Sequence, residues 1–385
     1  MTKEYRFTLA AITCAWFGFG IAITVLGPTI QPIRESFDLA MGETGLILLV
    51  GPPAYMAASL ISGRMSDVHG RKVFVIGGLL IMALGSLTLA SAPSWPQAIL
   101  GSTIMSLGFG LLDAPLCALI VDISGDNSSS TMNYTQAGFA AGAVLGPILT
   151  GLLLESAANW RLVYTLLALC AAIIAPLFIW SPTPSIGANL TPIPIRQIPK
   201  TLFRPRLFSL SIILALYIGL ELNLSLWLPS FMEMTFNSSR DISAWSVSFF
   251  WLGSGLGRLI MGYAAKRSDN YYLLSLCMCG GGLACLAISI SASAVTALIG
   301  IIVAGILIGG VFPIVISLAV SDNRNLAGTI TSAMMIVASI AAATVPPAGG
   351  PIAELSNMRI VLALGVPLGL VGATIALYVK KHQLY

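Results

Sequence analysis

The sequence GRMSDVHGRK, residues 63–72, is a short charged stretch between two long apolar runs. The run before it extends over about 44–63 and the run after it over about 73–91. Each run can cross roughly 30 Å of hydrocarbon as a helix, because about 20 residues suffice. The succession of apolar run, basic loop and apolar run is therefore typical of a helical integral membrane protein.

The composition of the whole chain agrees with a membrane location. Of its 385 residues, 57% are hydrophobic and 9% are charged, whereas a soluble domain carries about 25% charged residues. The apolar runs are continuous and do not alternate at every second residue, which favours transmembrane helices over a β-barrel. The net charge is +4, but the bases lie in short loops between apolar runs, so we expect no nucleic-acid partner.

The apolar pattern predicts twelve transmembrane helices in two groups of six. The segments are 7–30, 44–63, 73–91, 97–121, 134–154, 160–180, 209–233, 243–263, 271–291, 295–320, 327–348 and 358–379. The stretch 181–208 contains six prolines and four bases, which is typical of a semi-rigid linker. We expect an N-terminal bundle over 1–180, this linker over 181–208, and a C-terminal bundle over 209–385. Both bundles carry a basic loop after their second segment, as expected for an internal repeat.

The distribution of bases predicts the orientation of the chain. With twelve segments both termini lie on one side, and fourteen of the nineteen lysines and arginines fall on that side. Four bases fall on the opposite side, and Arg258 lies inside a segment. The excess of bases favours cytoplasmic termini in a plasma (inner) membrane. The first segment is too long for a signal-peptide core and is interpreted as a transmembrane span.

Nothing in the sequence indicates an enzyme. The six cysteines all lie inside apolar segments, and no histidine pair, metal-ligand cluster or nucleophile motif accompanies them. A phosphate-binding loop for ATP is also missing. We therefore expect no catalytic residue, no metal and no cofactor.

The stretch GRMSDVHGRK resembles motif A of the major facilitator superfamily, Gly-x-x-x-Asp-x-x-Gly-Arg-Lys/Arg. The matching residues are Gly63, Asp67, Gly70, Arg71 and Lys72. The resemblance covers the whole chain and implies two pseudo-symmetric bundles of six helices, with motif A acting as a gate on the cytoplasmic side. From the residues themselves, Gly63 favours close helix approach, Gly70 a tight turn, and Asp67 pairing with nearby bases. The alternative is a basic loop that only sets the topology.

A second stretch, GAVLGPILTG at 142–151, resembles motif C of proton-coupled drug antiporters. Small residues at this spacing favour tight helix packing, and a proline bends the span. The packing residues are Gly142, Gly146, Pro147 and Gly151. Two other features of drug antiporters are missing: the motif B arginine, which is replaced by Ile104, and an acid in the first segment.

Other stretches are similar to the fucose–proton symporter group. They are GFGLLDAPLC at 108–117, LYIGLELNLSLWLP at 216–229, GILIGGVFPIVISL at 305–318 and VPPAGGPIAE at 345–354. Asp113 lies at the acid position of that group, and Pro313 lies in the expected bend of the tenth segment. Cys117 replaces the asparagine that usually follows.

Charged residues inside the membrane are the candidates for function. Only Asp113 and Glu221 among the acids, and Arg258 among the bases, fall well inside the segments. A charge at mid-bilayer costs several kcal/mol, so such residues face a bundle interior and usually have a task. We expect Glu221, Asp113 or both to carry the proton during transport. The alternative is that either acid forms a permanent ion pair with Arg258.

The seventh segment also supplies most of the predicted substrate contacts. Tyr217, Glu221 and Ser225 are four residues apart and form one polar stripe on a helix. The full predicted set is Tyr217, Glu221, Asn223, Ser225, Trp227 and Arg258. Hydroxyl, carboxylate and aromatic groups suit a hydroxylated solute. We therefore expect a secondary active transporter, monomeric in the lipid bilayer, that moves a small polar, sugar-like solute with protons by alternating access. The alternative is a proton-coupled antiporter that exports drugs, metabolites or other amphipathic compounds.

Overall fold

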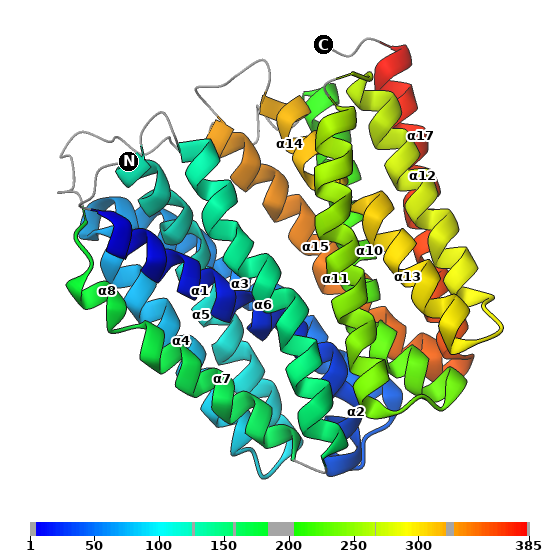
Figure 1. The fold of residues 1–385 in the computed structure, drawn as a ribbon, viewed down its shortest axis with the longest axis horizontal. Helices are drawn as coiled ribbons and strands as arrows, with labels where there is room; N and C mark the ends of the chain where they lie inside the picture. Colours follow the sequence, from blue (N-terminus) through cyan, green and yellow to red (C-terminus); the bar gives the residue numbers. More distant parts are fainter. Residues whose placement is uncertain are drawn as a thin grey trace. The chain divides into compact units, whose positions relative to one another are not determined.

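The computed structural model describes residues 5–124, 128–156, 159–183, 204–265, 267–320 and 327–382. These residues form helices joined by short turns, and no strand occurs among them (Figure 1). The predicted all-helical fold is therefore confirmed. Most of the predicted linker, residues 184–203, lies outside the described ranges.

The chain divides into two compact units. The first unit lies within Met1–Leu39 and Leu46–Pro192, and the second within Ala40–Gly45 and Ile193–Tyr385. The helices that begin in the first half of the chain are α1 (Arg6–Thr24), α2 (Leu26–Phe37), α3 (Met41–His69), α4 (Arg71–Ala90), α5 (Trp95–Ser124), α6 (Ser128–Glu155), α7 (Trp160–Ile174) and α8 (Leu177–Trp180). The first residues of α3 thus belong to the second unit.

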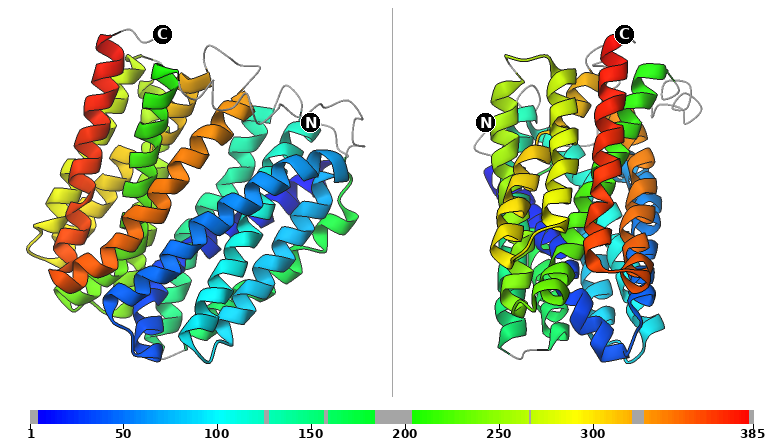
Figure 2. Two further views of the ribbon diagram at one scale, coloured as in Figure 1. Left: turned by 180° about the vertical axis from the view of Figure 1, so that it is seen from behind. Right: turned by 90° about the vertical axis from the view of Figure 1, so that its right-hand side faces the viewer.

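The second unit contains the remaining helices. They are α10 (Pro205–Phe236), α11 (Arg240–Ala264), α12 (Asn270–Ser289), α13 (Ala294–Ile308), α14 (Val311–Val320), α15 (Ala327–Leu355), α16 (Met358–Ala363) and α17 (Gly365–Lys381). Within this unit α12 and α17 run side by side (Figure 2). Helix α10 begins at Pro205, four residues before the predicted start of the seventh segment, because proline is favoured at the first position of a helix.

Eleven stretches among the described helices are long and apolar enough to cross a membrane. The eighth predicted segment corresponds to α11, which has 25 residues and is also long enough. Four serines and the charged residues Arg240, Asp241 and Arg258 lower its hydropathy. Large apolar side chains such as Leu259 (74% exposed) and Ile173 (64% exposed) point away from their bundles, as expected for helices surrounded by lipid.

Four predicted segments are each broken into two helices next to a proline, and in the sixth segment the break between α7 and α8 lies at 175–176. Pro28, Pro313 and Pro367 are each the third residue of the helix that follows the break. Proline has no N–H to bond the carbonyl four residues earlier, so the preceding helix ends there. In the tenth segment the break lies at Gly309 and Gly310, so Pro313 follows the bend and does not lie within it.

One end of each unit is built around an equivalent arginine. Arg161, at the start of α7, donates from Nη1 to the carbonyls of Ala90 (2.9 Å) and Ala92 (2.6 Å) at the end of α4. Arg359, at the start of α16, donates from Nη1 to two carbonyls at the end of α12, those of Ser289 (2.6 Å) and Ser291 (2.8 Å). A cation at a helix C-terminus satisfies carbonyls that have no partner within the helix.

The residues around the two arginines repeat as well. Asn159 and Asn357, two residues before the arginines, cap the helices α7 and α16 with their side chains. Phe37 lies 5.7 Å from the guanidinium of Arg161, and Phe236 lies 5.6 Å from that of Arg359. Each phenylalanine ends its helix and is followed by a residue in the left-handed conformation, Asp38 (φ 51°) or Asn237 (φ 50°). The two units are therefore internal repeats at this end.

Candidate functional site

The polar stripe predicted on the seventh segment lies on α10 in the second unit. Tyr217 (1% exposed) and Glu221 (6% exposed) are buried, and the Tyr217 hydroxyl donates a hydrogen bond to Glu221 Oε1. Ser225 continues the stripe and accepts a hydrogen bond of 3.1 Å from Nε1 of Trp251 on α11. The spacing of four residues places the three side chains on one face of the helix.

Arg258 of α11 completes this cluster. Its charge interacts with the Glu221 carboxylate, and its side chain also interacts with the Tyr217 hydroxyl. The Nε atom of Arg258 is buried and has no hydrogen-bond partner among the described residues. The structure thus brings Tyr217, Glu221, Ser225 and Arg258 together, and it adds Trp251 to them.

Two other residues of the predicted substrate set face different helices. Asn223 donates from Nδ2 to the Val361 carbonyl of α16 (2.9 Å), and Trp227 donates from Nε1 to the Pro346 carbonyl of α15 (2.8 Å). Both side chains are at most 1% exposed. A Cβ atom on Gly349 would lie 2.3 Å from Trp227 Nε1, so the indole is enclosed by α15. Their donors are therefore used in packing within the second unit.

Asp113 lies on α5 in the first unit and has a tyrosine of its own. The Tyr55 hydroxyl, from α3, donates a hydrogen bond to Asp113 Oδ2. On the other side, Cys117 Sγ lies 3.9 Å from Asp113 Oδ1, one turn along α5. Tyr55, Asp113 and Cys117 are all partly exposed, in contrast to Tyr217 and Glu221.

Tyr55 was not predicted from the sequence. Ser59 is the polar residue one turn further along α3, but the acid partner of Tyr55 lies on another helix. The two helices meet closely at Gly110, where a Cβ atom would lie 2.2 Å from the Tyr55 carbonyl. Ser62 reinforces the contact with a hydrogen bond of 2.9 Å to the Gly110 carbonyl.

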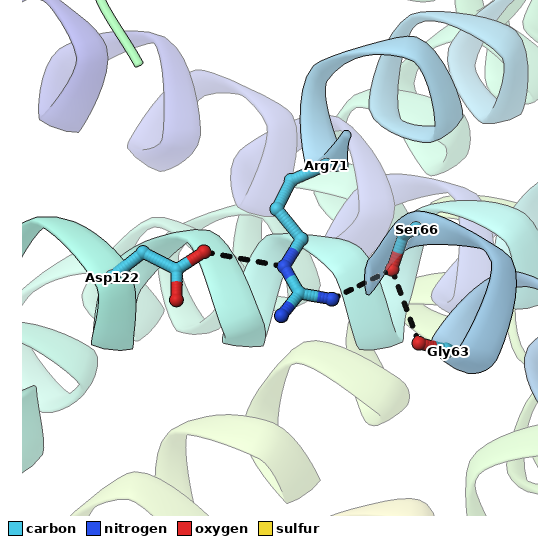
Figure 3. Close-up of polar contacts among 4 residues, drawn as sticks. All are labelled: Gly63, Ser66, Arg71 and Asp122. Carbon is cyan, nitrogen blue, oxygen red and sulfur yellow. Dashed lines mark hydrogen bonds and ion pairs between the residues drawn. The ribbon is translucent and has the colours of Figure 1, made fainter. Parts of the chain in front are cut away.

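The motif A residues join α3, α4 and α5 (Figure 3). Arg71 Nε lies 3.2 Å from Asp122 Oδ2, and Arg71 Nη1 donates to Ser66 Oγ (2.9 Å). Ser66 in turn donates to the Gly63 carbonyl at 3.2 Å. Lys72 reaches the end of α8 and donates to the carbonyls at 179 and 181, at 2.6 and 3.2 Å.

The two glycines of motif A differ in what they require. Gly70 has a φ of 96°, a left-handed conformation that favours glycine, so the predicted turn is present. The prediction for Gly63 is wrong: a Cβ atom there would lie 3.8 Å from Ala114 Cβ, which is an ordinary contact. The side chain of Asp67 lies outside the described part of the molecule.

The motif C residues lie on α6 and pack against α1. A Cβ atom on Gly142 would lie 2.1 Å from the Phe17 carbonyl, and one on Gly146 would lie 3.0 Å from Ile21 Cα. Pro147 lies inside α6, and Gly151 is buried on the same helix. At Gly142 the backbones of α1 and α6 are too close for any side chain, and at Gly146 a side chain would make an unusually tight contact.

Among the described residues, no group of three His, Cys, Asp or Glu side chains is arranged to hold a metal ion. The polar contacts described above define the candidate site as two carboxylate clusters, one in each unit. Each contains an acid, a tyrosine that donates to it, and one further ionisable side chain, either a thiol or a guanidinium.

A comparison with protein families matches the model for the Major Facilitator Superfamily to residues 11–346. Relatives that align over most of their length include the cyanate transport protein CynX of Escherichia coli, which is 23% identical over 87% of each chain, and two sugar transporters. The glucose/mannose transporter GlcP of Bacillus subtilis is 25% identical over 346 residues, which cover 86% of this chain and 84% of GlcP. A putative glucose/galactose transporter of Helicobacter pylori is 25% identical over 390 residues, which cover 94% of this chain and 93% of that protein.

Solved structures with this fold include a D-xylose–proton symporter. It superposes with a TM-score of 0.79 at 13% sequence identity and covers 97% of each chain. At this identity the likeness concerns the fold alone, and it confirms the predicted twelve-helix arrangement of two six-helix bundles.

Proposed function

The chain belongs to the Major Facilitator Superfamily, and we propose that it moves a small sugar-like solute across the membrane together with protons. It is a secondary transporter and not an enzyme. In the proposed mechanism the protein alternates between conformations that open its binding site to one side of the membrane or the other.

The buried cluster around Glu221 is the observation that carries this proposal. Glu221 lies in the middle of α10, a 32-residue helix, and is 6% exposed. A carboxylate at that depth is costly, and proton relays are one of the few roles that retain it. Tyr217 donates to it, and Arg258 supplies a positive charge that favours the ionised form.

This arrangement can couple a proton to solute movement. When Glu221 is ionised, Arg258 balances its charge inside the bundle. When Glu221 takes up a proton, that balance is lost and the guanidinium becomes available to another acceptor, such as a hydroxyl of the solute. Asp113 supplies a second carboxylate of the same kind in the first unit. Uptake of a proton and binding of a hydroxylated solute then favour each other.

Two observations support a sugar as the solute. Among the relatives that align over most of the chain, two are named for glucose with mannose or galactose, and another is named for cyanate. The stripe of Tyr217, Glu221 and Ser225, together with Arg258, presents hydroxyl, carboxylate and guanidinium groups that can bond several hydroxyls at once. Because Asn223 and Trp227 use their donors in packing, we leave them out of the proposed binding set.

The remaining parts of the proposal concern the gate and the location. The Arg71–Asp122 pair and the bonds of Arg71 to Ser66 fasten α4 to α5 and α3. We propose that these contacts hold the gate at the motif A end of the first unit. The excess of bases on the side of the termini supports cytoplasmic termini in the plasma membrane. We propose a monomer, since each unit carries its own carboxylate cluster.

Export of amphipathic compounds in exchange for protons is the second candidate. The close packing of α1 and α6 at the motif C glycines favours it, because that motif is typical of drug antiporters. The hydrogen-bonding character of the α10 stripe favours a polar solute instead.

The test is uptake of radiolabelled glucose, mannose and galactose by the purified protein in liposomes with an imposed proton gradient. We expect accumulation that follows the gradient and that a protonophore abolishes. Uptake of the lipophilic cation tetraphenylphosphonium in exchange for protons, with no movement of any of the sugars, would contradict the proposal and favour export.

A further inference from the structure

Trp16, in the middle of α1, has a buried hydrogen-bond donor without an acceptor. The side chain is 4% exposed, and its Nε1 atom has no partner among the described residues. The indole N–H can only donate, and buried donors in folded proteins nearly always have a partner. A donor at this depth can therefore take an acceptor that is supplied by something other than the described residues.

The indole belongs to a cluster of four aromatic rings from α1, α5 and α6. Its ring centroid lies 5.6 Å from that of Phe19 and 6.4 Å from that of Phe139, both in edge-to-face geometry. Phe19 also packs edge-to-face on Phe109 at 5.1 Å. We refer to Trp16, Phe19, Phe109 and Phe139 as the aromatic cluster.

The aromatic cluster adjoins the carboxylate of the first unit. Phe109 is four residues before Asp113 on α5, so the two side chains lie on the same face of that helix, one turn apart. Asp113 is held from its other sides by Tyr55 and Cys117. A largely buried group of aromatic rings, an unpaired N–H donor and a carboxylate acceptor therefore follow one another within the first unit.

These three groups match the chemistry of a sugar ring. The C–H groups of a sugar pack on aromatic faces, while its hydroxyl oxygens accept from an N–H and its hydroxyl hydrogens donate to a carboxylate. A lipophilic cation would use the aromatic faces and the carboxylate but has no acceptor for the N–H. The unpaired donor thus distinguishes a hydroxylated solute from an amphipathic cation.

We propose that the aromatic cluster is the surface on which the first unit binds the sugar ring, with Trp16 Nε1 donating to a sugar oxygen. The inference rests on the proposed function, because it takes a sugar to be the solute. It assigns Trp16 as a specificity-determining residue, which neither the motifs nor the carboxylate clusters include.

The test compares Trp16→Phe with a matched control, Trp95→Phe. Trp95 also has a buried indole N–H without a partner, but it packs on Phe37 at the far end of α5. Dissociation constants for glucose are measured by calorimetry on the purified proteins. We expect Trp16→Phe to weaken binding about 10-fold or more, the cost of one lost hydrogen bond in a binding site, and Trp95→Phe to leave binding unchanged.

A series of monodeoxy glucoses locates the bond from the side of the sugar. In the wild-type protein, removal of the hydroxyl that accepts from Trp16 should weaken binding about 10-fold, and in Trp16→Phe the same analogue should bind no more weakly than glucose itself. If Trp16→Phe does not fold, the wild-type series can still overturn the inference, since the inference requires at least one deoxy position with this loss.

The outcomes separate this inference from the proposed function. If the wild-type protein binds and transports sugar but Trp16→Phe and Trp95→Phe have equal affinity for it, the inference is wrong and the proposed function stands. If every deoxy analogue binds as tightly as glucose, the inference is equally wrong. If the wild-type protein neither binds nor transports any of the sugars, the proposed function itself fails.

Discussion

In the first unit the tyrosine and the acid of the carboxylate cluster come from different helices, whereas in the second unit they share one. Tyr55 of α3 donates to Asp113 of α5, and Tyr217 of α10 donates to Glu221 one turn further along the same helix. The neighbours differ too: Asp113 has the thiol of Cys117, while Glu221 has the charge of Arg258.

The ends of the two units that carry Arg161 and Arg359 are alike, in contrast to the two carboxylate clusters. The arginines Arg161 and Arg359 stand 198 residues apart in the sequence and make the same pair of bonds to the end of a neighbouring helix. A shift of 199 residues, nearly the same, aligns the sequences of the two halves so that Asp113 falls on Phe312 and Glu221 falls on Ala22. Neither Phe312 nor Ala22 is charged. The repeated residues hold the helices together, and the residues that were not repeated carry the function we propose.

Replacing the two acids one at a time should give the largest difference between the two clusters. Glu221→Gln cannot exchange a proton, so accumulation should be lost completely. With an imposed gradient of two pH units, one proton per sugar supplies about 2.7 kcal/mol, or about 100-fold accumulation. We expect a wild-type ratio near that limit and a ratio near one for Glu221→Gln, measured as the internal sugar concentration in liposomes.

Glu233→Gln is the matched control for this measurement. Glu233 also lies on α10 but near its end, where it pairs with Arg240 at 3.7 Å, and its replacement should leave accumulation intact. For Asp113→Asn we expect a smaller loss, about 10-fold in rate, with accumulation retained. Wild-type accumulation by Glu221→Gln would remove Glu221 as the proton carrier, and complete loss in Asp113→Asn alone would transfer that role to the first unit.

The charge of Arg258 can be tested by its coupling to Glu221. Arg258→Gln leaves a buried carboxylate without its positive neighbour, which typically costs about 3 kcal/mol of stability. The double variant Glu221→Gln, Arg258→Gln should recover at least about 1 kcal/mol of this loss. Thermal unfolding in detergent, followed by intrinsic fluorescence, measures both.

A variant in the first unit serves as the comparison for these single and double variants of Glu221 and Arg258. Cys117→Ala removes only a weak sulfur hydrogen bond to Asp113 and should cost less than about 1 kcal/mol. Additive effects of Glu221→Gln and Arg258→Gln would show that the two side chains do not interact. A loss from Cys117→Ala as large as that from Arg258→Gln would remove the difference between the two clusters.

The sequence alone predicted the features that depend on local spacing. Twelve apolar segments followed from their length, and the stripe of Tyr217, Glu221 and Ser225 followed from its period of four residues. Tyr55 was missed because its partner lies on another helix, 58 residues away in the sequence. Asn223 and Trp227 were placed with the substrate because spacing along one helix does not show which neighbouring helix a side chain meets.

The arginines at the repeated ends show a second limit of the sequence. Arg161 and Arg359 were interpreted only as charges that set the topology, although each is preceded by an asparagine two residues earlier. The repeated pattern Asn-x-Arg is a signal that could have identified them. Their bonds to Ala90 and Ser289 could not be predicted, because they depend on how each bundle closes.

Removing these arginines tests whether the repeated ends are equivalent. Arg161→Ala and Arg359→Ala each remove two hydrogen bonds from a charged donor to helix carbonyls. Partial exposure to solvent reduces the contribution of these hydrogen bonds to stability, so we expect a loss of about 2 kcal/mol in each case. The midpoint of thermal unfolding measures the loss, and Arg34→Ala, on the same side of the predicted topology, serves as a control with little effect. A loss confined to one unit would show that the second arginine is not part of an equivalent structure.

The smallest expected difference between the units lies at the N-terminal ends of α4 and α12, whose C-terminal ends are bonded by Arg161 and Arg359. In the second unit Lys380 of α17 pairs with Asp269 at the start of α12, and in the first unit Lys72 of α4 bonds the carbonyls at the end of α8. The hydrogen bond from Lys380 lowers the pKa of Asp269 below its usual value of 3.8. Both groups are partly exposed, so we expect Lys380→Gln to cost less than about 1 kcal/mol.

The pH dependence distinguishes these two lysines. Because the pKa of Asp269 is lower in the folded protein than in the unfolded chain, the contribution of the pair is complete above about pH 4 and is lost as the pH falls through the lowered value. The difference in unfolding midpoint between the wild-type protein and Lys380→Gln should therefore diminish as the pH falls below about 4, and it should also shrink in 1 M salt. Lys72→Gln removes bonds to carbonyls, which do not titrate, so its effect should be the same at pH 3 and pH 7. If both variants lost their effect over the same pH range, the pH dependence would arise from groups other than Asp269, and this last difference between the units would not exist.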